Sequence, residues 1–187
     1  MGYCIQSLNG INQECQGSLG GIKSVYIAIY QNVSAVELSS DAGDSKKISS
    51  ITMTESDAKF KAFEFRRNTA NMTSTLNVDP ANGTSVTTEL VMSFLRQEAT
   101  KRLEISALSM GDLAVIVKDA NDKYWYLGFN FPVMASAGTG ETGTAFTDGN
   151  RYSITLQDNA IDWPYEIKVA PSTTGDTNFV DLSSIIE

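Results

Sequence analysis

The residues from Thr69 to Leu95 alternate between two kinds of side chain, in two segments on either side of a turn. Side chains spaced two apart lie on the same face of a β-strand, so each segment has the pattern of a strand. The turn, residues 79–83, contains a proline, which fixes φ, and an Asn-Gly pair, which accepts positive φ. The pattern predicts a long β-hairpin with arms of about ten residues, where strands commonly have about five or six.

The two faces of this hairpin differ in chemistry. The face expected to pack inward on the core is mostly apolar, with Met72, Leu76, Leu90, Met92 and Phe94. The other face is polar and almost uncharged, with Asn71, Thr73, Thr75, Asn77, Thr87 and Glu89. A face that meets only solvent more often carries Lys and Glu, which also protect strand edges. This face is therefore predicted to meet another structure, with an ordinary solvent-facing sheet surface as the alternative.

Most of the remaining chain also has the composition of strands. Stretches rich in β-branched and aromatic residues predict strands at 22–30, 48–54, 60–65, 113–118, 124–131, 151–157 and 161–170. One helix is predicted over residues 96–110, with an apolar face at a spacing of four that comprises Leu95, Ala99, Leu103 and Ala107, with Leu108 beside them. The expected fold is mainly β, a β-sandwich or barrel with a long β-hairpin and one flanking α-helix. We expect an N-terminal arm (1–21), a sandwich or barrel domain (22–170) and a C-terminal tail (171–187).

Two further segments have the composition of exposed loops. Residues 39–47 are rich in Ser, Asp and Lys, and residues 135–144 are rich in Gly, Thr and Ala. The second segment contains Gly138-Thr-Gly-Glu-Thr-Gly143, which fits the G-x-G-x-x-G pattern of dinucleotide-binding proteins. That motif works only between a strand and a helix, where the helix N-terminus receives the pyrophosphate. No helical period follows here, so the segment is predicted to be a flexible loop.

The composition removes several classes of function. The chain has 187 residues and no histidine, which excludes Ser-His-Asp and Cys-His triads and histidine metal ligands. No apolar run approaches the roughly 18 residues that span a bilayer. Cys4 and Cys15 leave free thiols, a disulfide or a metal site open. No constellation of catalytic or metal-ligating residues emerges, so we expect neither an enzyme nor a bound cofactor.

The net charge of −8 lies entirely in the second half of the chain. Residues 1–102 contain equal numbers of acidic and basic side chains, and all of the excess acid falls in residues 103–187. A protein that holds nucleic acid needs a basic surface, because binding releases counterions from the phosphates. Direct binding of DNA or RNA is therefore not expected.

The order of elements is similar to that of a known family. A Gly-Gly-Ile start leads into a Val-Tyr-Ile strand, followed by the Thr-rich hairpin, a helix with the sequence Arg-Gln-Glu-Ala-Thr-Lys-Arg-Leu, the strand Leu-Ala-Val-Ile-Val-Lys-Asp, the segment Tyr-Trp-Tyr-Leu-Gly and a closing Tyr-Ser-Ile-Thr-Leu strand. Over roughly residues 20–170 this resembles the tail tube (major tail) proteins of tailed bacteriophages. The resemblance implies a sandwich or barrel flanked by one helix, and hexameric rings stacked into a tube around a DNA channel. It implies that the partners are further copies of the chain and other virion proteins, that DNA only passes through, and that no membrane is involved. The location would be the virion, which is assembled in the host bacterial cytoplasm.

Within this framework the polar face of the hairpin is expected to line the channel. Residues 39–47 and the N-terminal arm are expected to be ordered mainly by neighbouring subunits, with Asp41, Asp44, Lys46 and Lys47 in contacts between subunits. Two other classes remain open. One is a capsid decoration or head–tail connector protein, and the other is a carbohydrate-binding β-sandwich that uses the aromatic residues of Tyr124–Phe131.

Overall fold

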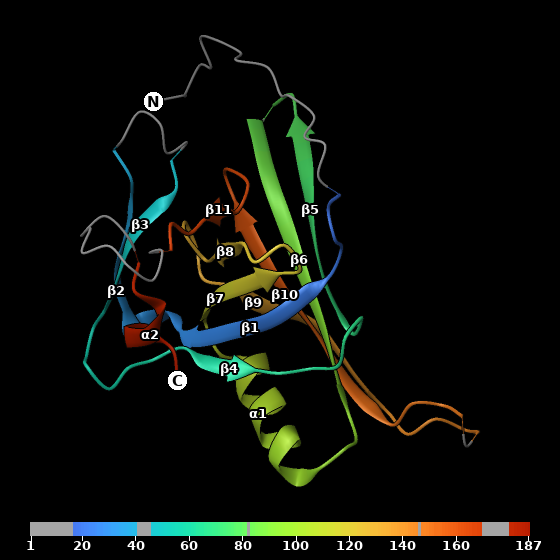
Figure 1. Ribbon diagram of the computed structural model, residues 1–187. Helices are drawn as coiled ribbons and strands as arrows, with labels where there is room; N and C mark the ends of the chain where they lie inside the picture. The colour runs from blue at the N-terminus through green and yellow to red at the C-terminus, as the bar shows by residue number, and fades with distance from the viewer. Residues whose placement is uncertain (1–16, 41–45, 82, 146, 170–179) are drawn as a thin grey trace.

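The computed structural model describes residues 17–40, 46–81, 83–145, 147–169 and 180–187 (Figure 1). Its five-stranded sheet has the order β11 (Tyr165–Glu166), β8 (Tyr124–Leu127), β7 (Leu113–Asp119), β1 (Ile22–Ile29) and β4 (Lys61–Phe63). A four-stranded antiparallel sheet has the order β5 (Ala70–Asp79), β6 (Gly83–Leu95), β10 (Arg151–Ala160) and β9 (Met134–Glu141). A third sheet pairs β2 (Val33–Leu38) with β3 (Ile48–Met53). The helices are η1 (Tyr30–Asn32), α1 (Ala99–Met110) and α2 (Leu182–Ile185).

The five-stranded sheet is the middle layer, because apolar side chains cover both of its faces. Strand β7 explains this directly, since all five residues from Leu113 to Val117 are buried. Alternate residues of β7 contribute to two cores. One core lies between this sheet and the four-stranded sheet, and the other lies against β3, α2 and the segment around Phe60. The mainly β, sandwich-like fold expected from the sequence is confirmed.

The long hairpin is confirmed as β5 and β6, which pair along their whole length with Thr73 opposite Glu89. Of the five residues expected to face inward, Leu90 and Met92 are fully buried, and Met72 and Phe94 pack against the same core. The expectation for Leu76 was wrong, because 46% of its surface is exposed. The β5–β6 hairpin extends toward the top of Figure 1, and no described sheet lies opposite its distal end.

The predicted helix begins at Ala99, and only part of its predicted apolar face is buried. Leu103 is 59% exposed and Ala107 is exposed, whereas Leu108 is buried and Ile105 packs against the first core. Only residues 111–112 connect α1 to β7. The C-terminal end of the helix, which carries Leu108, therefore lies close to the buried start of β7.

The glycine-rich segment expected to be a flexible loop is instead strand β9, which pairs with β10 from Met134 to Glu141. Its small residues are explained by what packs on it. A Cβ built on Gly140 would lie 3.0 Å from the Tyr152 ring and 3.3 Å from the Gln97 amide nitrogen. The segment was misread because glycine weakens a strand pattern, whereas here it allows other groups to approach the strand closely.

The last eight residues pack onto the domain. Val180, Leu182 and Ile185 are buried in the second core, and the backbone N–H of Phe60 donates to the carbonyl of Ile185 at 2.8 Å. The described end of the expected C-terminal tail is therefore part of the folded domain. Of the expected N-terminal arm, residues 1–16 lie outside the described residues. None of the described helices is long and apolar enough to cross a membrane.

Candidate functional site

The candidate site is the outer face of the four-stranded sheet, which we call the polar face. Alternation along each strand points one set of side chains into the core and the other set away from it. The six predicted residues on β5 and β6 all lie on this outward set. The register adds residues from the two neighbouring strands, namely Ser153, Thr155, Gln157 and Asn159 on β10 and Met134, Ala137 and Thr139 on β9. Two large apolar side chains, Val91 on β6 and Met134 on β9, lie among the polar ones.

Side chains of the polar face bond to one another across three strands. The Asn77 amide nitrogen donates to Thr87 Oγ1 at 3.0 Å, and Thr87 Oγ1 donates to Asn159 Oδ1 at 3.2 Å. The Gln157 amide also donates to Asn159 Oδ1, at 3.1 Å. These bonds use part of the hydrogen-bonding capacity of the face within the sheet itself.

The polar face carries little charge. Near its centre the only charged side chain in the register is Glu89, which is exposed. At one end of the sheet Arg151 forms an ion pair with Glu141. Asp79, at the distal end of β5, belongs to the same outward set and is exposed. Among the described residues of this face the net charge is therefore −2, since the Arg151–Glu141 pair cancels.

The β10 half of the face was missed by the sequence reasoning. The signal was present, because Ser153, Thr155, Gln157 and Asn159 alternate with Tyr152, Ile154, Leu156 and Asp158. The alternation alone does not show that β10 pairs with β6, and that pairing is what places these residues on the same face as the hairpin.

The predicted inter-subunit loop is only partly described. Asp41 and Asp44 lie outside the described residues. Lys47 forms an ion pair within its own chain, with Glu166 at 3.2 Å, and Lys123 contacts the same carboxylate at 2.8 Å. Burial alone would raise the pKa of Glu166, but hydrogen bonds from the two lysines outweigh it and hold the pKa below its usual range. Lys46 has a left-handed backbone conformation, with φ of 59°.

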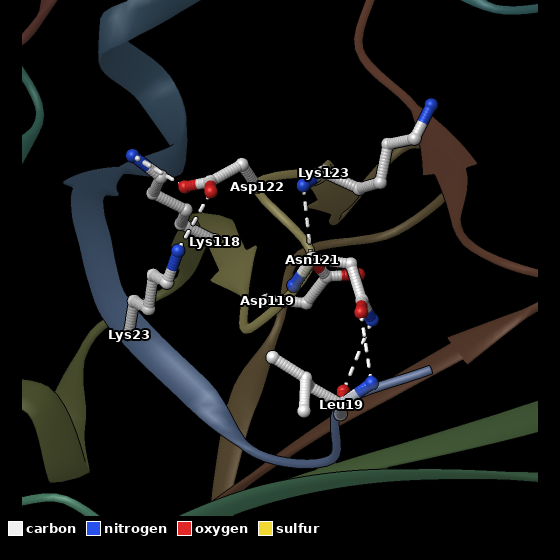
Figure 2. Close-up of polar contacts among 7 residues, drawn as sticks. All are labelled: Leu19, Lys23, Lys118, Asp119, Asn121, Asp122 and Lys123. Atoms are coloured by element: carbon white, nitrogen blue, oxygen red, sulfur yellow. Dashed lines mark hydrogen bonds and ion pairs between the residues drawn. The ribbon is translucent and has the colours of Figure 1, made fainter. Parts of the chain in front are cut away.

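The turn between β7 and β8 holds the beginning of the described chain (Figure 2). The backbone N–H of Leu19 donates to Asn121 Oδ1 at 2.9 Å, and the Asn121 amide donates back to the Leu19 carbonyl at 3.0 Å. Beside it, Asp122 lies 2.7 Å from the Lys23 ammonium and 3.3 Å from that of Lys118. Hydrogen bonds from these two lysines hold the pKa of Asp122 below its usual range. The turn therefore fixes the point at which the N-terminal arm leaves the domain.

One carboxyl group lies on the opposite, core-facing side of the four-stranded sheet. Asp158 is 3% exposed, and its Oδ2 accepts a hydrogen bond from the backbone N–H of Gly128 at 3.2 Å. Its Oδ1 has no hydrogen-bond partner among the described residues. Burial raises the pKa of Asp158, although the bond from Gly128 lowers it in part. Burial also raises the pKa of the nearby Tyr126 hydroxyl.

The described part of the chain offers little support for metal binding or for an aromatic platform on β8 alone that stacks on sugars. It contains no group of three or more Cys, Asp or Glu side chains placed to hold a metal ion. The aromatic residues of β8 do not form one platform, because Trp125 packs against the first core and Tyr126 is buried in the second.

No protein-family model, curated protein or solved structure matches this chain. Function is therefore inferred from the geometry of the sheet and of its polar face.

Proposed function

We propose that the chain is a virion structural protein, a tail tube subunit whose copies form stacked, hexameric rings around a DNA channel. The observation that carries the proposal is the polar face, which extends over four strands and is nearly uncharged. A channel wall must let DNA pass without holding it. Lysine or arginine on the wall would release counterions from the phosphates and slow the DNA. Hydroxyl and amide side chains bonded to one another provide a surface without that attraction.

The topology of the four-stranded sheet supports ring formation. In the antiparallel order β5, β6, β10, β9, the two edge strands run in opposite directions. When the β5 edge of one copy meets the β9 edge of the next, the new pair is also antiparallel. A heterologous contact of this kind closes into a ring when its rotation allows. Two long edges that would promote aggregation in a monomer then become the joints of the assembly.

The proposed role is structural, with no catalysis and no cofactor. The partners are further copies of the chain and other virion proteins, and DNA is a passing cargo that the acidic chain repels. The role requires no membrane contact. Assembly takes place in the host bacterial cytoplasm, and the final location is the virion.

Electron microscopy of the purified protein tests the proposal. Six-fold rings or tubes with a central channel are the expected result. Binding to capsids, or rings that join only heads to tails, would replace the proposal with a decoration or connector role. A stable monomer at high concentration that binds sugars would favour a carbohydrate-binding domain. Sedimentation over a range of concentrations distinguishes the monomer from the assemblies.

A further inference from the structure

A hollow at the edge of the five-stranded sheet is lined by both tryptophans of the chain, and we call it the tryptophan hollow. Its volume is about 260 Å³. The pairing of the edge strand β11 with β8 sets Glu166 opposite Trp125, which brings segments that are far apart in the sequence into one place. The lining includes Trp125, Trp163, Tyr165, Lys47, Asp162 and Glu166.

The aromatic side chains of the tryptophan hollow differ in how firmly they are held. Trp125 packs against the first core, and its indole nitrogen donates to Asp119 Oδ2 at 3.0 Å. The Tyr165 ring centroid lies 4.9 Å from that of Phe129. Trp163, by contrast, is 50% exposed, and no described residue accepts a hydrogen bond from its indole N–H. An open indole ring beside two fixed aromatic rings offers a ligand a stacking surface.

The charged side chains of the tryptophan hollow balance one another. Four of them line it, and the charges of Lys46, Lys47, Asp162 and Glu166 sum to zero. Lys47 contacts Glu166 at 3.2 Å, and Asp162 Oδ2 accepts from the Tyr165 hydroxyl at 3.3 Å. An anionic ligand would meet the two carboxylates, and a cationic ligand would meet the two lysines. A neutral ligand with hydroxyl groups bonds to both kinds of side chain without such repulsion.

We propose that the tryptophan hollow binds a neutral pyranose ring of a glycan. One face of such a ring presents C–H groups that pack on an aromatic ring, and its edge presents hydroxyls that bond to polar side chains. Pockets for drug-sized ligands have volumes of about 300–1,000 Å³, so a hollow of about 260 Å³ fits a single ring. Trp163 provides the stacking surface, and Asp162 and Lys47 provide an acceptor and a donor for the hydroxyls.

The inference goes beyond the proposed function and does not depend on it. The polar face belongs to the four-stranded sheet, whereas the tryptophan hollow lies at the edge of the five-stranded sheet. One subunit can therefore line a channel with one surface and bind a sugar with another. The hollow also differs from a platform built on Tyr124–Phe131, because Trp125 is the one residue of that segment that lines it.

Tryptophan fluorescence tests the site directly, because both tryptophans line it. The purified protein is titrated with the neutral oligosaccharides cellohexaose, maltohexaose and N-acetylchitohexaose, up to roughly 10 mM, where even weak sites fill. Calorimetry provides a second measurement of binding. We expect at least one of these sugars to change the emission and to bind at one site per chain. No binding of any of the three overturns the proposal.

Variants of exposed aromatic residues assign the binding to the tryptophan hollow. Trp163→Ala should weaken binding of that sugar about tenfold, and Trp163→Phe should restore most of it because an aromatic ring is kept. Phe131→Ala is the matched control, since Phe131 is 60% exposed and does not line the hollow. Thermal melts check that each variant is folded. Unchanged binding in Trp163→Ala, or an equal loss in Phe131→Ala, overturns the assignment.

Charged sugars test the argument from charge balance. An oligogalacturonate, which is anionic, and a chitosan oligomer, which is cationic, should both bind the wild type more weakly than the neutral sugar does. Glu166→Gln removes the carboxylate that Lys47 and Lys123 share, so it should strengthen binding of the oligogalacturonate but not of the chitosan oligomer. Tighter binding of either charged oligomer to the wild type overturns the choice of a neutral ligand.

Electron microscopy of the same samples separates this inference from the proposed function. Tubes that bind the sugar support both. Tubes that bind none of the sugars overturn the proposed glycan site and leave the tail tube role standing. Monomers that bind the sugar, with the loss in Trp163→Ala, support the glycan site and overturn the tail tube role.

Discussion

Replacing Asp158 with asparagine should stabilise the protein at neutral pH. The carboxyl group is almost fully buried, and one of its oxygens has no partner in the described chain. A buried polar group without a partner costs about 1–3 kcal/mol, and a charged one costs more. A carboxamide keeps the shape and the acceptor for the Gly128 N–H, and its amide nitrogen takes the place of the unpartnered Oδ1, so the expected gain comes from removing the charge. We expect Asp158→Asn to raise the free energy of unfolding by about 1–3 kcal/mol at pH 7.5.

The effect should depend on pH in a defined direction. Burial raises the pKa of Asp158 in the folded protein, so the unfolded chain loses this proton first as the pH rises. The wild-type free energy of unfolding therefore falls between the unfolded and the folded pKa, by about 1.4 kcal/mol for each unit of separation. Below both pKa values the carboxyl is protonated in both states. There the asparagine variant should have nearly the stability of the wild type.

Urea denaturation at pH 4, 5.5 and 7.5 measures the difference between the two proteins. For a chain of this size each kcal/mol corresponds to about 2–4 °C in Tm, so thermal melts provide a second readout. Asp112→Asn is the matched control, because it makes the same chemical change on an exposed side chain. The reasoning is refuted if Asp158→Asn is no more stable than the wild type at pH 7.5. It is also refuted if the advantage does not grow with pH.

Three further predictions concern the channel, the loop and a turn. Replacing Thr73 and Thr75 with lysine should leave tube assembly normal and impair DNA passage, measured as infectivity against a matched pair of lysines at the exposed residues Thr52 and Thr54. Fully infectious particles that carry the lysines would disprove the channel assignment. Residues 39–47 should resist protease better in the assembly than in the free subunit, and equal protection would contradict a role in subunit contacts. Gly128→Ala should lower the free energy of unfolding by about 1–2 kcal/mol, because φ is +96° and the new Cβ would lie 3.2 Å from a backbone oxygen. In urea melts Gly138→Ala, where the corresponding contact is 3.6 Å, should cost less, and equal losses would refute this.

The long hairpin could be predicted because its signal is local. The alternation along each arm and the turn between the arms depend only on residues that are close in sequence. The pairing of the two arms then brings the six predicted residues together on one face. The extension of the polar face onto β10 needed a long-range pairing that no local pattern reports. The exposure of Leu76 likewise depends on where the opposing sheet ends.

The sequence-based predictions for the buried face of α1 and for the β9 segment were wrong, the first only in part, for the same reason. The apolar pattern through Leu103 describes one face of a helix but does not say which residues of that face meet the sheet, and in the structure Leu108 and Ile105 do so while Leu103 stays exposed. In β9 the glycines removed the strand signal, although Gly140 is required by the close approach of the Tyr152 ring. Both outcomes follow from tertiary contacts that override local preference.

Because each subunit contributes a sheet of four strands, the channel diameter of the proposed tube can change only when whole subunits are added or removed. Because the two edge strands run in opposite directions, neighbouring copies always join through an antiparallel pair. The direction of the strands therefore does not limit the number of subunits in the ring. Each copy adds four strands, or about 19 Å of circumference across the strands. The diameter therefore changes in steps of about 6 Å per subunit before strand tilt is included. The angle between neighbouring copies, set by the twist of the sheet, is what must fix the number of subunits. A substitution that altered this twist would change the channel width in discrete steps.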